Sequence, residues 1–475
     1  MSVIDYSNLD SYEKMLAALG EIINGSGIEE TAVIQSPGTS QKIPERLVQI
    51  IWHDRHLKKS EMKTLSGKRV QLIEPGRWNE ESGPDFKSGE LLINGEKVKG
   101  DIEIHVNASD WIHHEHDGNY EYNGCILHAF LYNDNDLKTD VKFNGESLER
   151  LPLESYLYPD LDTLRQTISA DDFHYRENSH TGKCAPVLRK LEPEFLGRFL
   201  DLAGDRRLEE KTERLKRQLS GESWDQVFYQ SLMTSLGYKG GKTLFFLLSK
   251  RAPVDELLDY SNDHDEEERA IIIQSILYHV ANIIPLGGSS RKTMDSETIE
   301  YMNSLNRWWT ELSVYFSDRI LPPTKKWFSK VRPVNFPTRR MAGISRMIAR
   351  YAKSGELLPA FVALFRRGAE RNLDAKQTRT FLKETGKLLS VNVDPFWSYR
   401  YNFTSKKSSR KMTLIGQSRA RSILYNAILP LILLKAREEK DEELENFIWR
   451  CWRFFPRLQE NVITRFMKKR LFGDD

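Results

Sequence analysis

Polar and apolar side chains alternate over residues 101–106, a pattern that predicts a β-strand with two different faces. One face carries Asp101, Glu103 and His105, and the other carries aliphatic side chains. An Asn-Gly pair at residues 94–95 precedes this strand and favours the two-residue turn of a β-hairpin. We therefore predict a hairpin whose return strand presents three titratable groups side by side.

The same short-period pattern continues through the N-terminal third of the chain. It predicts strands over residues 69–73, 91–93, 98–106, 124–132, 141–144 and 148–153. A helix with an apolar stripe is expected to begin near Pro44, because proline is tolerated in a first helical turn. These elements predict a mixed α/β core over residues 44–155. An arm with one short helix, followed by a Gly-, Ser- and Pro-rich linker, is expected over residues 1–43.

After about Tyr156 the apolar residues recur at helical spacing, and no strand of comparable strength follows. Helices are predicted over residues 192–219, 223–237, 242–249, 265–282, 296–316, 336–353, 356–367, 375–388, 418–435, 441–454 and 458–471. The predicted fold class is therefore α+β, with an N-terminal mixed α/β core and a large all-helical C-terminal region over residues 156–475.

Composition narrows the class of protein. A chain of 475 residues with 39% hydrophobic residues is long enough for two or three domains. Its three cysteines lie far apart, which argues against a disulfide scaffold and favours a reducing compartment. The N-terminus has no signal-peptide pattern and the longest apolar run is too short to span a membrane, so we expect a cytoplasmic protein without a membrane partner. No feature of the sequence sets the oligomeric state, and Ser-His-Asp and P-loop patterns are absent.

The basic residues are segregated, although 70 basic and 68 acidic residues almost balance over the chain. Residues 319–355 contain ten lysines and arginines, residues 395–437 contain nine, and neither segment contains an acid. Aromatic residues are interleaved with them, as in surfaces that bind phosphates and stack on bases. We therefore expect DNA or RNA as a partner, contacted by Arg339, Arg340, Arg346, Arg350, Lys406, Lys407, Arg410 and Lys411. The alternative is a solvated surface, or pairing with acids such as those at residues 263–268.

Three residues combine into a candidate catalytic site at the predicted hairpin. Asp85 follows Gly83-Pro84 and precedes the hairpin, and Glu103 and His105 lie on its return strand. Two carboxylates suit an oxygen-loving ion that activates water for phosphodiester hydrolysis. The order Pro-Asp, hairpin, Glu-x-His resembles the PD-(D/E)xK, or restriction-endonuclease-like, superfamily, with histidine in place of lysine.

That resemblance implies a nuclease-like core and a role for each residue. Asp85 and Glu103 would bind Mg²⁺ or Mn²⁺, and His105 would activate or orient water. Glu45, on the helix before the sheet, matches the place where many members carry an extra carboxylate. Asp101 is a further accessory candidate. Histidine in place of the usual lysine at position 105 puts catalytic turnover in question but not the fold.

The register of the hairpin decides whether these side chains can meet. The turn at residues 94–95 fixes the pairing, and an unbroken ladder then places Asp85 opposite Ile104, on the wrong face of the sheet. A one-residue bulge, most naturally at Gly89, would shift the pairing by one residue. We therefore expect such a bulge, because it brings Asp85 opposite Glu103.

The same region offers an alternative site built from histidines. Seven of the eleven histidines lie between residues 53 and 128. His113 and His116 in a loop, with His105 and His128 on strands, supply imidazole nitrogens that suit zinc, iron or manganese. Zinc is therefore the alternative ion, although the spacing matches no zinc motif. Each histidine alone is also explained as a loop or core residue.

Several further motifs are spread along the chain from about Pro44 onward. They are found at residues 83–86, 100–105, 111–116, 122–128, 332–337, 416–430 and 460–461. Together they resemble a bacterial family catalogued only as a domain of unknown function, and this resemblance implies no activity. We expect a metal-dependent nuclease. The alternatives are a nucleic-acid-binding protein without turnover and a zinc- or iron-dependent hydrolase of a small substrate.

Overall fold

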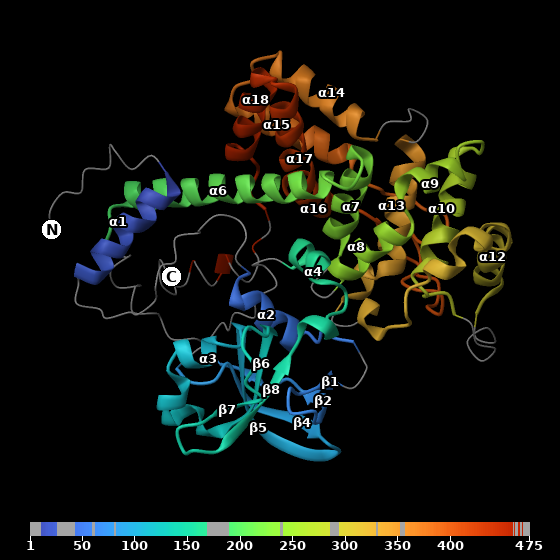
Figure 1. Cartoon of the computed structure of the whole chain (residues 1–475). Coiled ribbons are helices and arrows are strands. Elements are labelled where there is room, and N and C mark those ends of the chain that lie inside the picture. The colour runs from blue at the N-terminus through green and yellow to red at the C-terminus, as the bar shows by residue number, and fades with distance from the viewer. Residues whose placement is uncertain are drawn as a thin grey trace. The chain divides into compact units, whose positions relative to one another are not determined.

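The computed structural model describes residues 11–25, 43–58, 62–79, 82–168, 190–237, 241–285, 294–328, 331–351, 357–458, 460, 464, 465 and 468. The chain divides into two compact units, one of Met1–Glu29 with Thr181–Asp475 and one of Glu30–His180 (Figure 1). The predicted linker and most of the last predicted helix lie outside the described residues. Within the described part of the chain, no helix is both long and apolar enough to cross a bilayer.

The unit of residues 30–180 is built on one mixed sheet with the strand order β1-β2-β4-β5-β6-β8-β7, and β3 pairs with β4 at the side of this path. The strands are β1 (Met62–Lys63), β2 (Arg69–Glu74), β3 (Arg77–Trp78), β4 (Phe86–Ile93), β5 (Glu96–Asn107), β6 (Cys125–Tyr132), β7 (Thr139–Val141) and β8 (Ser147–Pro152). The helices are α2 (Glu45–His53), α3 (Asp110–His113), α4 (Leu161–Thr167) and the 3₁₀ turns η2 (His116–Gly118), η3 (Tyr120–Gly124) and η4 (Glu154–Tyr156). β4 is antiparallel to β5, whereas β6 is parallel to both β5 and β8.

The two faces of the central strands differ in polarity. Ile102 and Ile104 of β5 are fully buried in one apolar cluster with the buried side of α2, as the alternation predicts. On the opposite face the parallel register places Glu103 beside His128 of β6, and His128 beside Arg150 of β8. Titratable side chains from three adjacent strands therefore gather on the face that is not covered by α2.

The expected break in the hairpin register is present. β4 pairs Phe86 with Ile102 but Gly89 with Gly100, so β4 has one extra residue between these two pairs. Ser88 accommodates the bulge with a left-handed φ of 59°, rather than Gly89. Position 89 favours glycine for another reason, because a Cβ atom there would lie 2.4 Å from the Cδ1 atom of the buried Ile102, which would have to move.

The other unit is helical, in agreement with the predicted class. Its helices are α1 (Tyr12–Gly25), α6 (Pro193–Leu219), α7 (Trp224–Leu236), α8 (Lys242–Arg251), α9 (Val254–Asp259), α10 (Glu266–Val280), α12 (Ser296–Phe316), α13 (Pro337–Tyr351), α14 (Leu357–Ala369), α15 (Ala375–Leu388), α16 (Gln417–Ile423), α17 (Leu429–Glu439) and α18 (Glu442–Arg453). Figure 1 shows α1 beside α6, and Met15 and Leu19 of α1 are buried in one cluster with Phe195 and Leu196 of α6. The N-terminal helix therefore belongs to the helical unit rather than to a separate arm.

One predicted helix is divided. Residues 418–435 read as a continuous helix, but α16 and α17 are separated by a π-helical turn at Leu424–Ile428. Pro430 lies in the first turn of α17, has no N–H to donate, and its ring clashes with the carbonyl four residues before it. A wider turn accommodates this clash without ending the helix.

Candidate metal centre

Three histidines meet on the uncovered face of the sheet. His105 comes from β5, His114 directly follows α3, and His116 is the first residue of η2. Between these two, Glu115 has a left-handed φ of 56°, which bends the chain so that both imidazoles can face His105. The His105 Nε2 atom lies 3.2 Å from His114 Nδ1 and 3.3 Å from His116 Nε2. These three residues form a group that could hold a metal ion, with His105 and His116 buried and His114 exposed.

The Glu103 carboxylate lies beside two of these histidines. Its Oε1 atom lies 3.2 Å from His116 Nε2 and 3.5 Å from His105 Nε2. Ligand atoms held at about 2.0–2.1 Å by one tetrahedral ion are roughly 3.3 Å apart. The oxygen and the two nitrogens therefore have the mutual spacing of ligands to a single ion.

Hydrogen bonds alone cannot satisfy all the polar atoms around His105 Nε2. Its Nε2 atom is within 3.5 Å of an oxygen and two nitrogens. One neutral imidazole nitrogen either donates one hydrogen bond or accepts one, so it cannot serve all three neighbours. A cation at the centre would satisfy every atom at once. Three imidazoles with one carboxylate favour zinc, iron or manganese over Mg²⁺, which prefers oxygen ligands.

Asp85 lies directly beside this group, as the bulge requires. Its backbone N–H donates to Glu103 Oε2 at 2.9 Å, which orients the Glu103 carboxylate. The Asp85 carboxylate accepts from Gln49 Nε2 at 2.8 Å and from the Ile104 N–H at 3.1 Å. Gln49 also donates to Glu45 Oε1 at 3.2 Å. The predicted residues Asp85, Glu103, His105 and Glu45 are thus brought together, and the histidines, rather than Asp85, surround the space for an ion.

Burial sets the protonation of these groups when no ion is bound. It raises the pKa of Glu103 to about 8 and the pKa of Glu45 to about 7, and it raises the pKa of Asp85 well above its usual range. It lowers the pKa of His116 to about 4 and the pKa of His105 well below its usual range. The imidazoles are therefore neutral at pH 7 and can act as ligands without losing a proton.

A pH-dependent stability follows for the metal-free protein. A carboxyl group whose pKa is raised on folding stabilises the fold at low pH, and this contribution is lost as the pH rises through the folded-state pKa. Glu45 and Glu103, with pKa values of about 7 and about 8, should make stability fall from about pH 4.5, where the unfolded carboxyl groups ionise, to about pH 8. The lowered pKa values of His105 and His116 make stability rise with pH up to about pH 6.5, so they oppose this fall below that pH and leave it unopposed between about pH 6.5 and pH 8.

Thermal denaturation of chelator-treated protein across that window measures the effect. Glu103→Gln should reduce the pH dependence, because the amide does not titrate, and added Zn²⁺ should reduce it in the wild type by compensating the carboxylate charge. A flat profile for the metal-free wild type would contradict the burial of these carboxyl groups.

Three residues that were expected at the site do not face the space between His105, His114 and His116. His113 points outward, with 68% of its side chain exposed and its Nδ1 atom 3.6 Å from Asp110. His114 takes the position that was expected for His113. His128 lies behind His105 and contacts its Nδ1 atom at 2.9 Å. Asp101 supports the bulge instead, since it accepts from the Ser88 N–H at 3.0 Å and pairs with Lys87 at 3.1 Å.

Two of the arginines expected to contact nucleic acid are buried structural groups. Arg339 is fully buried and donates to backbone carbonyl oxygens of five residues, which fixes loops from two parts of the helical unit. Arg340 is 5% exposed and donates to the Leu414 carbonyl oxygen at 2.6 Å. Both guanidinium groups bond to backbone carbonyl oxygens inside the fold, so they are not available to contact a phosphate.

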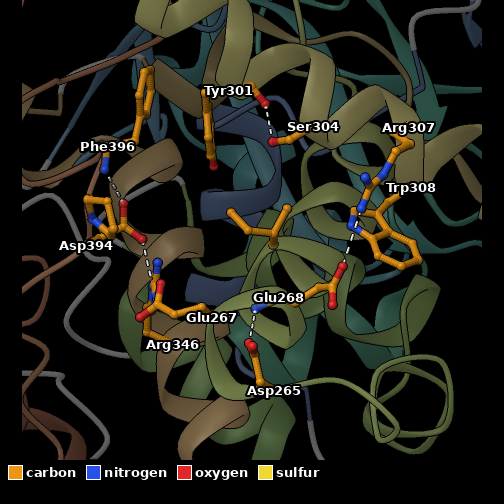
Figure 2. A pocket seen from close by; sticks show the side chains of 12 residues that line it. Asp265, Glu267, Glu268, Tyr301, Ser304, Arg307, Trp308, Arg346, Asp394 and Phe396 are labelled. Atoms are coloured by element: carbon orange, nitrogen blue, oxygen red, sulfur yellow. Dashed lines mark hydrogen bonds and ion pairs between the residues drawn. The ribbon is translucent and has the colours of Figure 1, made fainter.

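Arg346 is also internal. Figure 2 shows it in the wall of a pocket of the helical unit, between Asp394 and Glu267. Its Nε atom donates to Asp394 Oδ2 at 2.8 Å, and its Nη1 atom lies 2.5 Å from Glu267 Oε2. Glu267 belongs to the acidic segment that the sequence offered as the alternative partner of the basic runs. The remaining candidates are exposed, namely Arg350, Lys406, Lys407, Arg410 and Lys411.

Comparison with known proteins gives one match. A family model described as "Protein of unknown function (DUF2851)" matches residues 45–459. This range starts at the first residue of α2 and contains Glu103 and all three histidines of the centre, together with most of the helical unit. No curated protein and no solved structure matches the chain.

Proposed function

The chain belongs to the DUF2851 family of proteins of unknown function, and from the geometry of its centre we propose that it is a metal-dependent hydrolase of phosphodiester bonds. The proposal rests on one observation. Glu103 Oε1, His105 Nε2 and His116 Nε2 lie 3.2–3.5 Å from one another, and His114 Nδ1 lies 3.2 Å from His105 Nε2. The first three atoms have the spacing of ligands to one ion, and His114 adds a third imidazole nitrogen from the same group of histidines, so the nitrogen-rich set favours Zn²⁺, Mn²⁺ or Fe²⁺.

Each residue has a defined task in this proposal. When bound, the ion lowers the pKa of a water molecule and polarises a phosphoryl oxygen. His105, His114, His116 and Glu103 would hold that ion, and Glu103 is oriented by the hydrogen bond from the Asp85 N–H. Glu45 shares the Gln49 amide with Asp85 beside the centre and is the candidate to pass a proton to a leaving oxygen.

The substrate class rests on the order of residues around the hairpin. Asp85, Glu103 and His105 follow the pattern that resembles PD-(D/E)xK nucleases, and the bulge at Ser88 places the first beside the second. DNA or RNA is therefore the first substrate to test. The exposed Arg350, Lys406, Lys407, Arg410 and Lys411 remain candidates for contacts with its phosphates.

The test combines metal analysis with a cleavage assay on the full-length protein. Labelled single- and double-stranded DNA and RNA are incubated with metal-free protein refilled with Zn²⁺, Mn²⁺ or Mg²⁺, and with chelator. We expect about one ion per chain and cleavage that is restored by Mn²⁺ or Zn²⁺. His113→Ala is the matched control, because this neighbouring histidine points away and should leave metal content and cleavage unchanged. Protein that retains none of these ions would exclude the proposal.

A small phosphodiester is the second candidate substrate. It is favoured because Arg339, Arg340 and Arg346 are engaged inside the fold, which reduces the case for a long polyanion. Bis(p-nitrophenyl) phosphate serves as the probe in the same assay. Hydrolysis of this probe without cleavage of any nucleic acid would favour a small-substrate hydrolase, whereas nucleic-acid affinity without hydrolysis of either would favour a binding protein.

A further inference from the structure

A buried chain of polar groups runs from the candidate centre across the sheet. His105 Nδ1 lies 2.9 Å from His128 Nε2, and His128 Nδ1 lies 2.6 Å from Asp140 Oδ2. Arg150 Nε lies 3.5 Å from the same Asp140 oxygen. All four residues are at most 3% exposed. Burial this complete in an otherwise apolar region costs free energy unless every charge is compensated.

The charges in this chain define which nitrogens carry protons. Asp140 and Arg150 are opposite in sign and compensate one another, so a protonated His128 would add an uncompensated buried charge. His128 is therefore neutral and has a single N–H. A carboxylate can only accept, so this N–H lies at Nδ1 and donates to Asp140, which leaves His128 Nε2 as an acceptor.

The direction of this bond determines the state of His105. The acceptor at His128 Nε2 requires a donor, so His105 carries its proton at Nδ1. Its Nε2 atom then has a free lone pair, and that atom is the one which faces Glu103, His114 and His116. The direction of these hydrogen bonds thus makes His105 a ligand toward the centre.

We propose that Asp140, acting through His128, is a positioning residue that fixes the Nδ1–H tautomer of His105 and thereby prepares its Nε2 atom to bind a divalent transition-metal ion. This inference rests on the proposed function for its metal, although the tautomer is a property of the protein alone. The sheet supports it. β6 is in parallel register between β5 and β8, and β7 pairs Asp140 with Leu148 of β8, so the four strands bring the chain together without a flexible loop.

Asp140→Asn tests the proposal with little change in volume. The amide can donate to His128 Nδ1, which reverses the direction of both hydrogen bonds and places the His105 proton at Nε2. We expect the affinity of the full-length metal-free protein for Zn²⁺ and Mn²⁺, measured by competition with a chromophoric chelator, to fall about 10–100-fold. The pH at which half of the protein binds metal should rise, because binding now requires a proton to be removed. Asp136→Asn is the matched control, since Asp136 is exposed and lies on the same segment.

The second measurement does not depend on metal. Nitrogen NMR of ¹⁵N-histidine-labelled protein distinguishes the two imidazole tautomers, and the signal that His105→Gln removes is assigned to His105. We expect the Nδ1–H form in the wild type and its loss in Asp140→Asn, with an unchanged circular dichroism spectrum. A wild-type His105 that carries its proton at Nε2 would overturn the proposal, as would equal metal affinities in wild type and Asp140→Asn. If the wild type binds no ion but keeps the Nδ1–H tautomer, the proposed function fails while the assignment of Asp140 stands.

Discussion

Replacement of Glu103 by alanine should abolish metal-dependent hydrolysis and strongly reduce metal binding. Glu103 supplies the one carboxylate oxygen in the group, 3.2 Å from His116 Nε2 and 3.5 Å from His105 Nε2. Removal of a ligand should exceed the roughly 10–100-fold loss that follows removal of an outer partner. Metal content and the rate of phosphodiester cleavage, measured on the same preparation, give the result.

The matched control is Glu90→Ala. Glu90 lies on the neighbouring strand β4 but pairs with Lys97 at the surface, 2.8 Å away, so its loss should leave both measurements unchanged. Glu103→Ala should also retain the fold, because the variant removes a buried carboxyl group with a raised pKa that is costly to ionise. Full activity in Glu103→Ala would place the chemistry elsewhere.

Replacement of Arg346 by alanine should destabilise the helical unit by about 3–5 kcal/mol, the usual cost of removing one partner from a buried ion pair. Arg346 is 6% exposed and its Nε atom donates to Asp394, which is 1% exposed. Without the guanidinium, the buried Asp394 carboxylate keeps its bonds from backbone N–H groups and Gln274 but loses its compensating charge. Chemical denaturation followed by the helical circular dichroism signal measures the loss.

Arg350, one turn further along α13, is the control. It is exposed, and Arg350→Ala should change the free energy of unfolding by less than about 0.5 kcal/mol. Comparison of Arg346→Ala with Arg350→Ala also distinguishes a nucleic-acid surface from internal ion pairing as the role of this basic segment. If Arg346→Ala keeps full stability and instead weakens nucleic-acid binding, the arginine contacts phosphates and the buried pair has been misjudged.

The elements around the centre were predictable because they depend on local patterns. The alternation at residues 101–106 predicts which face of β5 is polar, and residue counting alone requires one extra residue for Asp85 to reach Glu103. The exact place of that residue was not predictable. A left-handed φ favours glycine, yet Ser88 adopts it, while the neighbouring Gly89 lies where the Ile102 side chain approaches the strand.

The choice between His113 and His114 could not be made from the sequence. It depends on the end of the short helix α3 and on the left-handed conformation of Glu115, which reverses the chain and directs His114 and His116 toward His105. No propensity rule places that conformation on a glutamate. The clustering of histidines was the available signal, and it indicated the region correctly but not the individual ligands.

Three of the eight basic residues expected on a nucleic-acid surface lie inside the fold, and the sequence could not show this for a different physical reason. A count of charges along the chain does not distinguish a solvated arginine from one that bonds to carbonyl groups inside the fold. Arg339, for example, holds backbone oxygens that are about 60 to 75 residues away in sequence. Long-range hydrogen bonds of this kind leave no periodic pattern, so arginine-rich helices need a structure before they are assigned to a nucleic-acid surface.

The exposure of His114 has a kinetic consequence. Three of the four ligand side chains at the centre are buried, and His114 alone is open to solvent. Exposed side chains change rotamer within picoseconds to nanoseconds, so this imidazole can swing away and return without unfolding the surrounding sheet. The ion should therefore exchange through this single side chain, and a soluble chelator should strip it from native protein at neutral pH. His114→Ala should speed that release far more than it speeds unfolding.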